Sequence, residues 1–127
     1  MMENINTLID RYAPAPEAGD QLSGAVRAHN VEHAEKMQSA LIMIAQHEKR
    51  DEDWVRASMV SITLESLMAA CAHPVVPGSM REDIKQDVAL LPGFDPKLSA
   101  FEQHEETHRN YAYFTAMMKY ALMRSAA

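Results

Sequence analysis

Apolar residues recur at three- and four-residue intervals along most of this chain, and no long segment alternates apolar and polar residues as a half-buried strand does. The clearest example is the set Leu22, Val26, Met37, Ala40 and Ile44. Their spacing predicts one long helix over residues 16–48. Proline and glycine are concentrated at 14–16, 74–78 and 92–96, which marks the chain breaks.

Three more helices are predicted between these breaks. One runs over residues 51–72 with Asp51 as its N-cap, and it is apolar almost all round from Met59 onward. A shorter helix opens on the capping-box sequence at 79–82 and stops before Pro92. The last runs over 95–124, with Asp95 as N-cap and Pro96 as first helical residue. A short helix within the first dozen residues ends at Pro14.

The sequence therefore predicts an all-α fold. Four main helices would form one mostly antiparallel four-helix bundle over residues 1–127, with a short N-terminal helix beside it.

Composition and net charge argue against several classes of function. The chain has 127 residues, 47% of them hydrophobic, and a net charge of −6, which argues against a phosphate-binding surface and so against nucleic acid as partner. The single cysteine, Cys71, cannot form an internal disulfide, and because the first residues show no basic segment followed by an apolar one we expect no secretory signal. Apolar runs are far shorter than the roughly 20 residues that span a bilayer. We expect a cytoplasmic protein that does not bind membranes.

Two histidine pairs are the candidate functional residues. His29 and His33 lie four residues apart on the apolar side of the first long helix. His104 and His108 do so on the last, where the residues predicted to face inward with them are Phe101, Tyr111, Met118 and Leu122. Residues at this spacing lie one above the other on one helix face. Because buried imidazole nitrogens need partners, four inward histidines point to a metal ion.

Glu65 is the predicted carboxylate ligand of the same site. It is the only charged residue between Arg56 and the end of its apolar helix. Folding the helices antiparallel places Glu65 and the middles of the two pairs within about 9 Å along the bundle axis. His47 shares the face of His29 but lies about 20 Å further along, and is excluded. The predicted ligands of a divalent ion, zinc or iron, are His29, His33, Glu65, His104 and His108.

Other interpretations of these residues stay open. A buried histidine–glutamate hydrogen-bond network could fix the register of the helices without metal. Residues 104–108 also match the H-E-x-x-H pattern of zinc proteases, in which Glu105 would be the general base, although the chain offers no strand to bind an extended peptide. Glu105 or Glu32 could instead join the site, allow two ions and make oxygen chemistry feasible. Whether the protein is an enzyme is undecided.

Two His-x-x-x-His steps on facing helices, with a carboxylate between them, resemble the metal-binding four-helix bundles of the haemerythrin-like and DinB-like groups. The resemblance lies in spacing and architecture. His104 and His108 match the DinB-like pattern, in which a third histidine comes from another helix. The His-x-x-x-Glu and terminal His-x-x-x-x-Asp steps of haemerythrin-like proteins are not arranged that way here, which argues against oxygen binding.

A second class of function fits the same chain. A small acidic interaction protein, such as an inhibitor or adaptor of the kind that phages and mobile elements encode, needs no catalytic motif. Its histidines would be structural, and an exposed apolar or acidic patch would contact a protein partner or a second copy of the chain.

Overall fold

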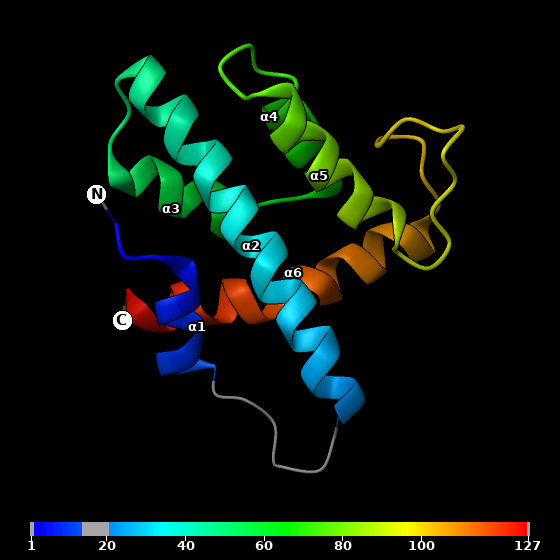
Figure 1. Cartoon of the computed structure of the whole chain (residues 1–127), viewed down its shortest axis with the longest axis horizontal. Helices are drawn as coiled ribbons and strands as arrows, with labels where there is room; N and C mark the ends of the chain where they lie inside the picture. The colour runs from blue at the N-terminus through cyan, green and yellow to red at the C-terminus, as the bar shows by residue number, and fades with distance from the viewer. Residues whose placement is uncertain (1, 14–20, 127) are drawn as a thin grey trace.

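The described residues, 2–13 and 21–126 of the computed structural model, form an all-α protein of six helices without a strand (Figure 1). The helices are α1 (Ile5–Tyr12), α2 (Gln21–Glu48), α3 (Glu52–Val60), α4 (Leu64–Cys71), α5 (Gly78–Ala89) and α6 (Glu105–Ser125). Within this part of the chain, no helix is both long and apolar enough to cross a membrane.

The predicted N-terminal helix is confirmed as α1, and the first long helix as α2 from Gln21 onward. Pro14 and residues 16–20 of those predictions lie outside the described residues. Asp51 is the N-cap of α3, as predicted, because its carboxylate accepts a hydrogen bond from the Trp54 backbone N–H. The predicted capping box at 79–82 is wrong, since α5 begins two residues earlier, at Gly78 with Pro77 as N-cap, and has no side-chain cap.

The predicted helix over 51–72 is divided into α3 and α4 by residues 61–63. Thr63 and Ser66 form a capping box that starts α4, each side chain accepting a hydrogen bond from the other's backbone N–H. Lys119 of α6 donates to the Ile62 carbonyl at 2.8 Å. Local side-chain hydrogen bonds thus replace the helical ones at this break.

The last helix begins nine residues later than predicted, at Glu105. The buried Gln103 side chain holds the segment before it in turns: its Nε2 donates to the carbonyls of Asp95 and Leu98, and its Oε1 accepts from the Asp95 N–H. The Asp95 carboxylate accepts from the Lys97 N–H but opens no helix. Backbone groups bound in this way are not free to form the predicted first turns.

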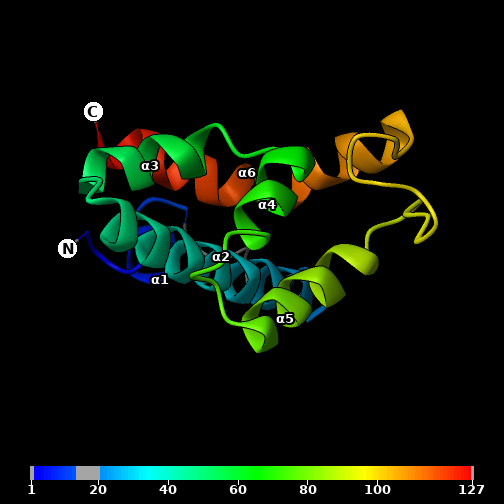
Figure 2. The same ribbon diagram turned by 90° about the horizontal axis from the view of Figure 1, so that it is seen from above.

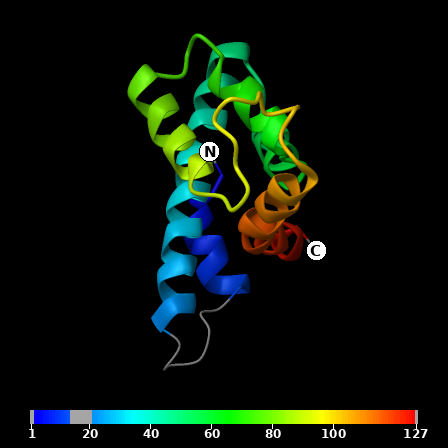
Figure 3. The same ribbon diagram turned by 90° about the vertical axis from the view of Figure 1, so that its right-hand side faces the viewer.

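The antiparallel four-helix bundle is not confirmed. The long helix α2 packs against α1, α3, α4, α5 and α6, and it crosses α6 steeply (Figures 1 and 3). Seen from above, α3, α4 and α6 form one layer and α1, α2 and α5 another (Figure 2). The core lies between them.

Much of the predicted core is observed. The apolar residues Met37, Ala40 and Ile44 of α2 are buried, as are Tyr111, Met118 and Leu122 of α6. Two predicted inward residues are exposed. Val26 lies in the first half of α2, and Phe101, 81% exposed, lies in the turns that replace the predicted start of the last helix.

Candidate functional site

His33 is the best-defined functional side chain of the predicted set. It lies on α2, is only 1% exposed, and bridges two other helices. Its Nδ1 is 3.1 Å from Oδ2 of Asp87 on α5, and its Nε2 is 3.3 Å from the hydroxyl of Tyr111 on α6. Lys36, one turn along α2, donates to both Asp87 carboxylate oxygens at 3.2 and 3.3 Å. The cluster His33, Lys36, Asp87 and Tyr111, of which Lys36 alone is partly exposed, therefore joins three helices.

The protonation of this cluster follows from its surroundings. Burial raises the pKa of Asp87, but the hydrogen bonds and charges of His33 and Lys36 outweigh this effect and hold it below its usual range. Burial raises the pKa of Tyr111, so the hydroxyl keeps its proton. His33 Nδ1–H donates to the carboxylate, and Nε2 accepts from the Tyr111 O–H when the ring is neutral or donates to the Tyr111 oxygen when it is charged, so both ring nitrogens have partners.

The cluster is built for packing more than for chemistry on a substrate. The Tyr111 ring meets His33 edge-on, and the Phe114 ring lies 4.6 Å from His33 between centroids. Because His33 and Tyr111 are 1% and 2% exposed, a substrate has no contact with either ring. These contacts form a buried histidine hydrogen-bond network of the kind that the sequence left open, but its carboxylate is Asp87 and not the expected glutamate.

His29, the second member of the first pair, lies one turn before His33 and contacts the same Phe114 ring at 5.4 Å between centroids. Its Nε2 is buried and has no hydrogen-bond partner among the described residues. The predicted inward direction of this nitrogen is thus observed, but the predicted ligand set does not surround it.

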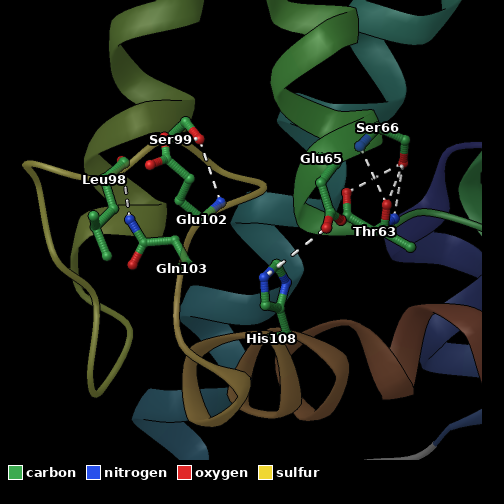
Figure 4. A network of polar contacts seen from close by, with 8 residues as sticks. All are labelled: Thr63, Glu65, Ser66, Leu98, Ser99, Glu102, Gln103 and His108. Carbon is green, nitrogen blue, oxygen red and sulfur yellow. Dashed lines mark hydrogen bonds and ion pairs between the residues drawn. The ribbon is translucent and has the colours of Figure 1, made fainter.

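Glu65 and His108 are the only predicted ligands that the described structure brings together from different helices. Glu65 Oε1 of α4 lies 3.9 Å from His108 Nε2 of α6 (Figure 4). Both side chains are partly exposed, at 41% and 29%. The expected neighbourhood of Glu65 and a histidine is therefore confirmed, but it forms near the surface rather than in a closed core.

His104 does not share a helix face with His108, contrary to the prediction. It is the N-cap residue of α6, it is exposed, and its side chain makes no capping hydrogen bond. The reason is the late start of α6 after the turns held by Gln103. The H-E-x-x-H interpretation loses its basis for the same reason, because both histidines of that motif must project from one helix face. Glu105 and Glu32 are both exposed.

Among the residues that the structure describes, no three or more histidine, cysteine, aspartate or glutamate side chains are grouped so that they could hold a metal ion. The five predicted ligands are instead separated: His33 belongs to the cluster with Asp87, and Glu65 and His108 form a partly exposed ion pair. His104 is an exposed N-cap, and His29 lies against Phe114.

Sequence reasoning missed Asp87 and Tyr111 as the partners of His33. A signal for Asp87 was present, because it lies three residues after Ile84 and next to Val88, and these two are the buried apolar residues of α5. A charged residue on the buried side of a helix needs a partner. Tyr111 was expected inside, but its hydroxyl was not matched with a histidine.

The structure also shows an uncharged stripe on the outer face of α6. Tyr113, Ala116, Tyr120 and Met123 are all exposed, the three larger ones at 70%, 52% and 64%. Their spacing of three and four residues places them on one face, opposite the buried Tyr111, Met118 and Leu122. From Thr107 to Ser125 the helix carries Arg109, Lys119 and Arg124 and no acidic residue.

Comparisons with protein-family models, with curated proteins and with solved structures find no match for this chain.

Proposed function

We propose that this chain is a small acidic interaction protein that binds a protein partner through the stripe Tyr113, Ala116, Tyr120 and Met123 of α6. The observation that carries the proposal is the exposure of two tyrosines and a methionine on one helix face. Aromatic residues and methionine are enriched at protein interfaces, and apolar anchors at this spacing are how a helix binds in a groove. The histidines are structural on this proposal.

Charge indicates the kind of partner. The stripe belongs to a helix whose charged residues after Glu106 are all basic, in a chain whose net charge is −6. Two copies meeting α6 to α6 would place these cations against each other. A groove with apolar walls and acidic edges on a different protein matches the stripe better.

The single cysteine, Cys71, is free and buried. A free cysteine is compatible with the reducing cytoplasm, which we propose as the location of this protein.

The test is a pair of matched captures followed by direct binding. The wild-type protein, Tyr113→Ser/Tyr120→Ser and the control Leu90→Ser, which alters an exposed leucine outside the stripe, are used to capture partners. A partner retained by wild type and control but lost by the double variant is purified. Its Kd for the double variant should be raised about 30-fold or more, the effect of losing one or two interface hot spots.

Two results would contradict the proposal. If the purified partner binds the double variant as tightly as the control, the stripe is not the interface. If sedimentation shows a wild-type dimer that the double variant converts to a monomer, the stripe joins two copies of this chain instead.

A metal site is the second candidate, and two observations favour it. The unpartnered His29 Nε2 and the His108–Glu65 pair leave imidazole and carboxylate groups that zinc or iron could use after side-chain rearrangement. Metal analysis of protein purified without a His-tag tests it. This candidate requires near-stoichiometric metal that His108→Ala lowers sharply and His47→Ala leaves unchanged. Equal content in both variants excludes His108 as a ligand.

A further inference from the structure

An apolar groove of about 670 Å³ lies between α4, α5 and the turns that precede α6. Its volume is within the range of about 300–1,000 Å³ typical of small-molecule sites. Figure 4 shows Leu98 and Ser99, two of its lining residues, beside α5. The groove lies apart from the α6 stripe, so it carries a separate inference.

The walls of the groove suit a hydrocarbon chain. Leu64 and Val88 are buried, and the side chains of Met68, Phe94 and Leu98 are partly exposed along it. An apolar ligand covering these three side chains would remove their surface from water, which favours binding. Methionine adapts its shape to a bound apolar group more readily than branched residues do.

The charged residues of the groove are both cations. Arg81 and Lys85 of α5 contribute to the lining, and no carboxylate is present among the described residues that line it. Arg81 is held in place because its Nε donates to the Cys71 carbonyl at 2.6 Å. Lys85 forms only an exposed ion pair of 3.9 Å with Glu82, which water screens. In a chain of net charge −6, this pair of cations is a local exception.

The charges of Arg81 and Lys85 also act on the buried thiol of Cys71. Burial raises its pKa, while the charges of Arg81 and Lys85 act in the opposite direction. Arg81 and Lys85 lie four residues apart on α5 and therefore on one face of that helix, and Cys71 lines the same groove.

We propose that this groove binds an amphiphile with a single hydrocarbon chain and an anionic head, of the class of long-chain carboxylates. The chain lies along Met68, Phe94 and Leu98, and the carboxylate is paired with Lys85 and Arg81. A bound carboxylate neutralises the two cations, which the apolar lining residues cannot do. The hydrocarbon chain covers apolar side chains that are otherwise exposed to water.

The experiment is calorimetric titration of the full-length protein with laurate, and with dodecanol and dodecylammonium as the neutral and cationic forms of the same chain. Laurate should bind most tightly and dodecylammonium least. Lys85→Gln should weaken laurate binding by up to about fivefold, the effect of one partly exposed charge pair, and leave dodecanol binding unchanged.

Two matched variants locate the ligand. Ala89→Trp places a large ring at an exposed lining position, whereas Gln86→Trp changes an exposed residue of α5 outside the lining. The first should abolish laurate binding and the second should not. In spectra of methyl-labelled methionine, laurate should shift the Met68 signal and leave the Met123 signal in place.

Each alternative result overturns the proposal. Absence of laurate binding to the wild type excludes the ligand class. Equal binding of laurate and dodecylammonium excludes the pairing with Lys85 and Arg81. Equal laurate binding by the two tryptophan variants excludes the groove as the site. The laurate measurements do not depend on the outcome of the capture experiment, because the groove and the α6 stripe share no residue.

Discussion

Replacing Asp87 by alanine should lower the free energy of unfolding by about 2–4 kcal/mol. The substitution removes the carboxylate that accepts from His33 and Lys36, at 3.1 to 3.3 Å. Leaving the buried His33 Nδ1 without an acceptor costs about 1–3 kcal/mol. Breaking a fully buried pair costs about 3–5 kcal/mol, but Lys36 is partly exposed and regains water, so the expected loss is smaller.

Urea unfolding followed by circular dichroism measures this loss directly. In a domain of this size it corresponds to a fall in Tm of about 10 °C. Asp83→Ala is the matched control, because Asp83 is exposed one turn earlier on α5, and it should change stability by less than about 0.5 kcal/mol. A double-mutant cycle with His33→Ala should give a coupling energy of at least about 1 kcal/mol. Equal losses for Asp87→Ala and Asp83→Ala would refute the structural role of the cluster.

Three further predictions concern the same fold. Because the pKa of Asp87 is lowered in the folded state, its contribution is present above the pKa of an unfolded aspartate and is lost as pH falls through the folded value. The stability gap between wild type and Asp87→Asn should therefore be constant from pH 7 to 5 and narrow below about pH 4, as urea titrations at each pH would show. Glu65→Gln should cost less than about 1 kcal/mol in urea unfolding, because the pair with His108 is partly exposed, and a larger loss would mean that the pair is buried in solution. Ile9→Ala should cost about 2–5 kcal/mol, because Ile9 is fully buried in α1, whereas the exposed control Arg11→Ala should be near neutral; similar values would mean that α1 is not docked.

The candidate site shows where sequence reasoning fails. The spacing of His29 and His33 correctly placed His33 and one ring nitrogen of His29 inside the protein, because helix geometry alone determines which residues share a face. The same argument failed for His104, since the turns held by Gln103 prevent the helix from reaching it. A periodic pattern cannot show that one buried amide side chain will bind the backbone groups of Asp95 and Leu98 and so prevent a helical turn there.

The sequence by itself determined the all-α class, the approximate helix ranges and much of the core, including Met37, Ile44 and Met118. These follow from local periodicity, which depends on residues within a few turns of each other. Only the tertiary structure decided the partners of His33, which lie 54 and 78 residues away on α5 and α6. It also decided that α2 and α6 cross at a steep angle instead of packing side by side as in the predicted bundle. Both depend on how distant helices pack, and no local pattern encodes the angle or the register at which they meet.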